Sequence, residues 1–270
     1  KGNGRTSVLE NLLPDIMASL SKMSEAKETR CDADGFKAVL GFLCGFVGTG
    51  KNAEKEADGY LIGGKTGTAE KPKAGGYSDK RYWSDAGWRW REEVKAVHPI
   101  YWRRGDDGNW WVRTFDTEIP LPPNHPVSHV SWFEAEAWCR WAGRRLPSEA
   151  EWEAAAAYGP TGQLESDMPK RRYAWGDSID GCPANLDGRH LGVVDVGAYP
   201  AGDSAVGCRQ MIGNVWEWTA DTFEPYPGFE PDSYKEYSID LFGKSKVLKG
   251  GAWPTRSRMV NGTYRNYFAP

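Results

Sequence analysis

Apolar residues recur at helical spacing in two stretches in the middle of the chain, at about residues 131–142 and 149–157. Ser131 and Ser148 precede these stretches, and each serine is followed three residues later by a glutamate. This spacing is typical of a capping box, in which the serine and glutamate side chains bind backbone N–H groups at the start of a helix. We therefore predict two short helices, and we expect Gly143 to end the first.

Alternation of apolar and polar residues indicates short strands elsewhere. Gly213–Trp218 combines a small-residue turn with an aromatic–acid–aromatic alternation, which predicts a turn leading into a buried strand. The two indoles are expected on one face of this strand, with Glu217 on the other as a buried acid that needs a partner. We predict further strands at Trp110–Arg113, Val247–Trp253 and Thr263–Phe268.

The first part of the chain has a different pattern. Residues 1–44 carry apolar side chains mostly at helical spacing, whereas aromatic residues become frequent from about residue 75. We predict two parts, an N-terminal segment at 1–74 that is partly helical and a loop-rich domain at 75–270. The mixture of short helices and short strands in the second part predicts an α+β fold.

Composition narrows the classes of function. The 270 residues carry a formal net charge of −3 without a long run of one sign, so we expect no nucleic-acid partner. The 32 glycines and 17 prolines favour a fold with many turns. The 14 tryptophans and 12 tyrosines are explained either by an aromatic-rich core or by an aromatic pocket for a cationic or planar ligand, and the two are compatible.

The five cysteines are scattered and form no CxxC pair. This argues against a disulfide scaffold or a zinc ribbon and favours a reducing compartment, so we predict a cytoplasmic protein. A Cys182–Cys208 bridge remains an open alternative. No secretory signal opens the chain, and the apolar run Phe36–Val47 is too short to span a membrane.

Gly48–Pro72 resembles the late part of penicillin-binding transpeptidase domains through the Lys–Thr–Gly–Thr phrase at Lys65–Thr68. The phrase offers an ammonium and hydroxyls beside a glycine that lets a substrate backbone approach. A working transpeptidase also requires an SxN motif upstream, and no such triplet precedes Lys65. We expect a fragment without transpeptidase activity.

A broader resemblance covers about residues 75–270 and rests on five phrases in order. They are Pro126–Trp132, Arg145–Glu153, Tyr173–Gly176, Gly213–Trp218 and Leu248–Trp253. Together they resemble the formylglycine-generating-enzyme (sulfatase-modifying factor) family. The resemblance implies a C-type-lectin-like fold, which is mixed and loop-rich.

Three further phrases resemble one branch of that family, the sulfoxide synthases of ergothioneine biosynthesis. They are Gly75–Trp88, Tyr226–Tyr237 and Tyr264–Phe268. The resemblance implies a non-heme Fe(II) enzyme that uses O₂ to join the thiol of cysteine or γ-glutamylcysteine to Nα-trimethylhistidine. The oligomeric state is not indicated.

The same resemblance implies roles for five aromatic residues. Tyr234 and Tyr237 are the expected catalytic tyrosines, since a phenol near the oxygen chemistry can supply a proton. Tyr267, Phe268 and Trp253 are expected at the substrate, with Tyr267 against the trimethylammonium. Phe268 stands where some members have an acid that helps bind γ-glutamylcysteine, which favours free cysteine. The alternative is that these aromatics are core residues.

Iron ligands are not identified in the sequence. The resemblance implies three histidines, two of them in an HxxxHxE helix of an N-terminal domain, but residues 1–74 contain no histidine. His125 and His129 have i, i+4 spacing, yet Pro126 between them argues against a helix that presents both. His98 and His190 are isolated in the sequence, and we expect structural roles for them.

Calcium is the other metal implied by the family. Asn185 and Asn214 match positions that hold Ca²⁺ in relatives, and oxygen ligands suit that ion. Six such ligands cannot be counted from the sequence, and a turn-forming role for Asn214 is the alternative.

The chain has no cysteine after Gly251, so the family's oxidase branch, which uses a copper-binding cysteine pair there, is excluded. We predict a domain of the sulfoxide-synthase type with weak or absent activity as the chain stands. Two alternatives remain open, a non-catalytic lectin-like binding module and a mosaic chain that carries a transpeptidase fragment.

Overall fold

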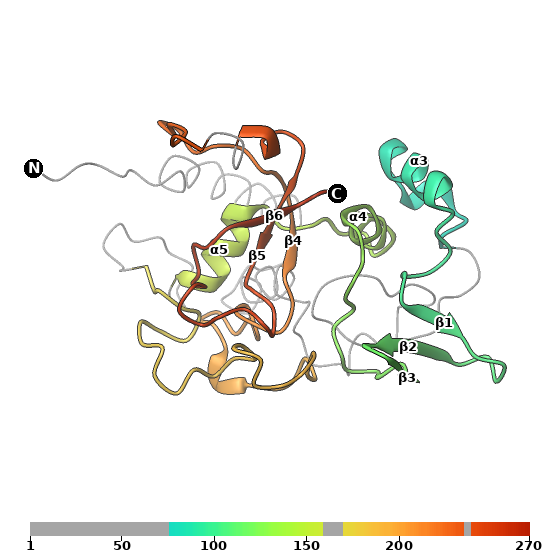
Figure 1. The fold of residues 1–270 in the computed structure, drawn as a ribbon, viewed down its shortest axis with the longest axis horizontal. Helices are drawn as coiled ribbons and strands as arrows, with labels where there is room; N and C mark the ends of the chain where they lie inside the picture. The colour runs from blue at the N-terminus through green and yellow to red at the C-terminus, as the bar shows by residue number, and fades with distance from the viewer. Residues whose placement is uncertain (1–75, 159–169, 235–238) are drawn as a thin grey trace, which may run out of the picture.

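The computed structural model describes residues 76–158, 170–234 and 239–270 (Figure 1). The segment predicted at 1–74, with its transpeptidase-like phrase, lies outside the described residues. Tyr237 lies outside them as well. The division at about residue 75 therefore stays a prediction.

In the described part of the chain, short helices and two small antiparallel sheets make up the regular structure, which confirms the mixed α+β, loop-rich fold. The helices are α3 (Asp85–Val94), α4 (Trp132–Trp141) and α5 (Glu149–Ala157), with 3₁₀ turns at Lys80–Tyr82, Pro200–Gly202 and Ile239–Leu241. The first sheet has the order β1 (Trp102–Arg104), β2 (Trp110–Thr114), β3 (Thr117–Pro120). The second has the order β4 (Glu217–Thr222), β5 (Lys246–Lys249), β6 (Asn266–Phe268).

Both predicted helices and both predicted capping boxes are confirmed. Ser131 Oγ accepts from the backbone N–H of Glu134 at 3.2 Å, and the Glu134 carboxylate accepts from Ser131 N at 2.7 Å. Ser148 and Glu151 repeat this exchange at 3.1 and 2.7 Å. Gly143, with φ of +65°, follows the end of α4 as expected.

Helix α3 was not among the helices predicted from the sequence. Ser84 is its N-cap and accepts from the backbone N–H of Gly87 at 3.2 Å. A glycine inside the helix lowers its intrinsic helix propensity and hides it from pattern reading. A Cβ at Gly87 would lie 3.3 Å from Trp83 and 3.4 Å from Phe133, so glycine permits close packing between α3 and α4.

The stretch Gly213–Trp218 is a turn followed by the start of β4. Gly213 and Asn214 have φ of +86° and +67°, and the strand begins only at Glu217. The expectation of two indoles on one strand face was wrong for Trp216, which precedes the strand and packs against Tyr264 with ring centroids 5.9 Å apart. Trp218 donates from Nε1 to the backbone oxygen of Val130 at 3.1 Å.

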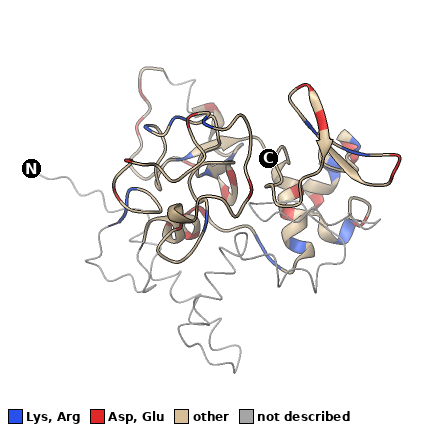
Figure 2. Cartoon of the chain, turned by 90° about the horizontal axis from the view of Figure 1, so that it is seen from below, with Lys and Arg blue, Asp and Glu red and all other residues tan. Residues whose placement is uncertain are grey.

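Two apolar clusters form the interior. One lies around Trp152, Leu186, Ile212 and Val260, and the other lies around Tyr77, Trp83, Trp138 and Leu146. In Figure 1, α5 and β4–β6 lie in one half of the molecule and α3 and β1–β3 in the other, with α4 between them. Acidic and basic residues are interspersed over both halves (Figure 2).

Cys139 and Cys182 are free, buried thiols. The alternative of a Cys182–Cys208 bridge was therefore wrong. Among the helices in the described part of the chain, none is long and apolar enough to cross a membrane.

Candidate functional site

An aromatic cluster lies where the loop after β4 meets the edge strand β6, and it consists of Phe223, Tyr226, Phe229, Phe242 and Tyr267. Phe223 stacks on Tyr267 with ring centroids 4.5 Å apart and on Phe242 at 5.1 Å. Phe229 meets Phe242 edge to face at 5.3 Å. Strand pairing fixes this arrangement, because Tyr267 pairs with Val247 on β5, and the backbone N–H of Phe223 donates to Ser245 just before β5.

The cluster already holds one cation. The guanidinium of Arg265 lies 4.3 Å from the ring centroid of Tyr226 and 4.8 Å from that of Phe223. Such distances are typical of cation–π contacts. The rings of this cluster are thus oriented to stabilise positive charge.

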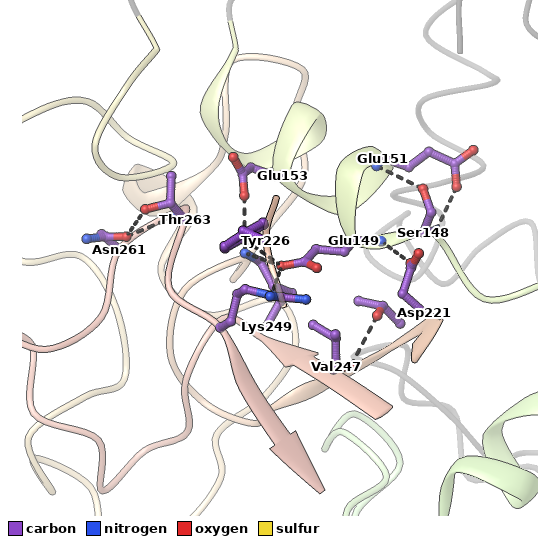
Figure 3. Close-up of polar contacts among 12 residues, drawn as sticks. Ser148, Glu149, Glu151, Glu153, Asp221, Tyr226, Val247, Lys249, Asn261 and Thr263 are labelled. Carbon is purple, nitrogen blue, oxygen red and sulfur yellow. Dashed lines mark hydrogen bonds and ion pairs between the residues drawn. The ribbon is translucent and has the colours of Figure 1, made fainter. Parts of the chain in front are cut away.

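Glu149, in the first turn of α5, is the carboxylate on which three neighbouring groups converge (Figure 3). Arg265 Nε lies 2.8 Å from Glu149 Oε1, Lys249 Nζ lies 3.6 Å from it, and Tyr226 Oη lies 3.5 Å from it. The backbone N–H of Glu149 donates to Asp221 at 2.6 Å. This bond ties the start of α5 to β4.

A second carboxylate, Glu153, lies one turn further along α5. It pairs with Lys249 at 3.3 Å and with Lys170. Burial lowers the pKa of Lys249, and the charges of Glu153 and Glu149 oppose that shift. Burial also raises the pKa of Tyr226, and the charge of Glu149 adds to the rise, so the Tyr226 phenol stays protonated at neutral pH.

Glu217 is partly buried and has a hydrogen-bond partner. Trp152 Nε1 donates to Glu217 Oε2 at 2.5 Å. The same indole lies under Lys249, whose Nζ is 5.4 Å from the ring centroid. Glu217 and Trp152 therefore join β4 to α5 beside the charged network.

Of the residues predicted for the site, some lie in or next to the aromatic cluster and others lie elsewhere. Tyr267 belongs to the aromatic cluster, and Phe268 follows it on β6 with 66% of its surface exposed. Tyr234 is 67% exposed in the loop after β4. Trp253 meets a different aromatic residue, Phe115 in the turn between β2 and β3, at 6.2 Å. The roles implied for these residues stay predictions.

Three charged residues of the site were not singled out from the sequence: Glu149, Lys249 and Arg265. Each lies inside a phrase that carries the family resemblance, but the phrases do not show that they meet. One local signal was present, because Lys249 follows two apolar residues of a predicted buried strand. A lysine in that position requires an anionic partner.

Asn185 and Asn214 lie side by side, as expected for residues of one site. Asn185 Nδ2 donates to Asn214 Oδ1 at 3.1 Å, and Asn214 Nδ2 donates to Gln210 Oε1 at 2.6 Å and to Val194 O at 3.1 Å. Asn214 Oδ1 also accepts from the N–H of Val194. Asn185 Oδ1 is buried and has no hydrogen-bond partner among the described residues. Asn214 is a buried turn residue with φ of +67°, and the calcium role implied for the two asparagines stays a prediction.

The four histidines lie in separate surroundings. His98 Nδ1 is 2.9 Å from Pro99 O, His190 Nε2 is 2.9 Å from Tyr199 Oη, and His129 packs its ring against Tyr101. His125 and His129 are not on a helix, as predicted. Within residues 76–158, 170–234 and 239–270, no three His, Cys, Asp or Glu side chains are grouped to hold a metal ion. The described residues therefore do not fit the three-histidine iron site that the resemblance implies.

Comparison with known proteins gives the family. The model of the sulfatase-modifying factor enzyme 1-like domain matches residues 55–270. Hercynine oxygenase of Mycolicibacterium thermoresistibile is 45% identical over 204 residues, which are 73% of this chain and 43% of that protein. Hercynine oxygenase of Mycobacterium tuberculosis is 44% identical over 73% of this chain and 45% of its own length.

A formylglycine-generating enzyme of Streptomyces coelicolor is 37% identical over 63% of this chain and 52% of its own length. The chain thus spans less than half the length of the two hercynine oxygenases. The family-model match nevertheless includes every described residue. The chain belongs to the family that shares the sulfatase-modifying factor enzyme 1-like domain.

Proposed function

We propose that this chain is a substrate-binding domain for O₂-dependent C–S bond formation between a cysteine thiol and Nα-trimethylhistidine. The observation that carries the proposal is the similarity to hercynine oxygenases over 73% of the chain. Hercynine is Nα-trimethylhistidine, a betaine whose quaternary ammonium has no N–H to donate. Aromatic faces recognise such a cation without hydrogen bonds.

The aromatic cluster supplies suitable faces. Phe223 and Tyr226 already lie against a guanidinium, and Tyr267 stacks on Phe223 with part of its surface exposed. We assign the trimethylammonium to the Tyr267 side of this cluster. Arg265 lies against Phe223 and Tyr226 and pairs with Glu149, whose carboxylate offsets the guanidinium charge.

The overall reaction is balanced by O₂ alone. One oxygen atom is transferred to sulfur as the new C–S bond forms, and the other leaves as water with the hydrogens of the thiol and of the imidazole carbon. Tyr234 and Tyr237 are the tyrosines that the resemblance implies for proton transfer. Fe(II) is the cofactor that it implies for activating O₂, and no step through a metal is assigned to the described residues.

The side chain at position 268 bears on the choice between cysteine and γ-glutamylcysteine as the thiol substrate. A neutral ring at this exposed position of β6 offers no carboxylate to pair with the ammonium of a γ-glutamyl group. Free cysteine is therefore the proposed co-substrate, with γ-glutamylcysteine as the competitor to test against it.

Isothermal titration of the full chain with trimethylhistidine and with histidine tests the proposal. A cation–π contribution of about 0.5–2 kcal/mol predicts roughly two- to thirtyfold tighter binding of trimethylhistidine. Tyr267→Leu is expected to remove most of that preference. Tyr82→Leu, at a partly exposed tyrosine beside α3, is the matched control and is expected to retain it. Equal affinities for the two ligands in the unmodified chain would contradict the proposal.

A further inference from the structure

Arg265 connects three segments of the candidate site that are far apart in the sequence. Its side chain reaches Glu149 at the start of α5, its Nη1 donates to the backbone oxygen of Glu224 at 3.0 Å, and its own backbone leads directly into β6. The side chains of Arg265 and Glu149 are 13% and 14% exposed. The connection is therefore mostly shielded from solvent and its salt screening.

We propose that Arg265 is a positioning residue that holds the aromatic cluster in the arrangement needed to bind the trimethylammonium group. The proposal rests on the proposed function for the identity of the ligand. Its structural basis is independent of the ligand, because Arg265 lies against two rings of the cluster and the Tyr267 ring stacks on one of them.

The geometry requires an arginine. The planar guanidinium covers the Tyr226 ring at 4.3 Å and the Phe223 ring at 4.8 Å while Nη1 holds Glu224 O. A lysine ammonium is a compact point charge and cannot meet two ring faces and a carbonyl in this planar arrangement. Arg265 Nε contacts Glu149 as an ion pair without the alignment of a hydrogen bond, so the rings and Glu224 O define the orientation of the guanidinium.

Glu149 makes this arrangement compatible with a cationic ligand. An uncompensated guanidinium inside the cluster would repel a second cation. The Glu149 carboxylate, 2.8 Å from Arg265 Nε, offsets that charge. Loss of the carboxylate would leave the rings in contact with Arg265 but make the cluster more positive.

The test compares Arg265→Lys with Arg258→Lys, an arginine-to-lysine change at an exposed position after β5. We expect Arg265→Lys to weaken trimethylhistidine binding at least threefold, to change histidine binding less, and to keep a single cooperative thermal transition. Glu149→Gln is expected to weaken trimethylhistidine binding as well. Arg258→Lys should bind both ligands like the unmodified chain. Unchanged trimethylhistidine affinity in Arg265→Lys would overturn the proposal.

A ligand-free measurement separates this proposal from the proposed function. The measurement is a double-mutant cycle. The shift in unfolding temperature of the double variant Arg265→Lys, Phe223→Leu is compared with the sum of the shifts of the two single variants. Non-additive shifts support the contact between the guanidinium and the ring that supports Tyr267, and additive shifts overturn it. If the unmodified chain shows no preference for trimethylhistidine, the proposed function fails, and this cycle still decides whether Arg265 holds the cluster.

Discussion

Lys249 Nζ lies 3.3 Å from Glu153 Oε2, and the lysine side chain has no exposed surface. Glu149 Oε1 is the second acid near this ammonium, at 3.6 Å, and Lys170 shares Glu153 from the more exposed side. Burial lowers the pKa of Lys249, and the charges of both carboxylates oppose that shift. The two acids on α5 and a lysine on β5 thus form the charged centre beside the aromatic cluster.

Lys249→Met is expected to destabilise the fold by roughly 3 kcal/mol, because it removes a cation and leaves buried carboxylates with less compensation. Lys170→Met is the matched control. It removes another partner of Glu153, but the Lys170 side chain is 28% exposed, and we expect a loss of about 1 kcal/mol or less. Urea denaturation gives both values. Equal losses would show that burial of Lys249 does not determine its contribution.

The raised pKa of the Glu134 carboxyl predicts that the stability of the fold depends on pH. Burial raises the pKa of this carboxyl above 4.5, although hydrogen bonds from Tyr77 Oη at 2.6 Å and from Ser131 N at 2.7 Å oppose the rise. The folded chain therefore holds this proton more tightly than the unfolded chain does. The stability contributed by protonation of Glu134 is present below pH 4.5 and is lost as the pH rises through the raised pKa.

Glu134→Gln is expected to remove this component from the pH profile. Tyr77→Phe deletes the phenol that favours the carboxylate, so it should move the loss of stability to higher pH. Denaturation from about pH 4 to pH 8 measures both effects. A profile that stays unchanged in Glu134→Gln would contradict the assignment.

Gly250, directly after β5, has φ of +91° and lies close to the backbone of Met211. A Cβ at this position would lie 2.5 Å from Met211 O and 3.3 Å from the Trp152 ring. Gly207 has a similar φ of +83°, but a Cβ there meets nothing within 4 Å. Gly207→Ala therefore measures backbone strain alone, about 1–2 kcal/mol.

Gly250→Ala adds the clash with Met211 O to the same strain. We expect it to lose about 1–3 kcal/mol more stability than Gly207→Ala. Thermal unfolding of the two variants provides the comparison. If their losses are the same, the close approach at Gly250 does not constrain this turn.

Local chemistry explains which elements were predictable from the sequence. Helices α4 and α5 have serine N-caps and glutamates three residues later, and all the interactions of a capping box lie within one turn. Helix α3 has a serine N-cap as well, but glycine, Gly87, stands three residues later in place of the glutamate of a capping box. The reason for this glycine is the packing of α3 against α4, which a local pattern does not contain.

The candidate site depends on contacts between distant residues. Glu149 and Arg265 are separated by most of the second half of the chain, and their meeting follows from how β6 and α5 pack around β5. The family resemblance predicts a substrate-binding role for Tyr267, but it did not reveal that Phe223 stacks on its ring. Sequence patterns identified β2 and, with different bounds, β4, β5 and β6, but not β1 or β3. The pairing of these side chains required the structure.

Phe268→Asp tests the choice of thiol substrate. Phe268 is two-thirds exposed at the edge strand β6, and the resemblance implies an acid at this position in members that bind γ-glutamylcysteine. A carboxylate here can pair with the ammonium of the γ-glutamyl group. An exposed ion pair of up to about 1 kcal/mol predicts roughly a two- to fivefold gain in affinity for γ-glutamylcysteine relative to cysteine. Phe268→Leu removes the ring without adding charge and controls for its loss. Competition binding with both thiols measures the ratio, and the same ratio in the Asp and Leu variants would show that Phe268 does not select the co-substrate.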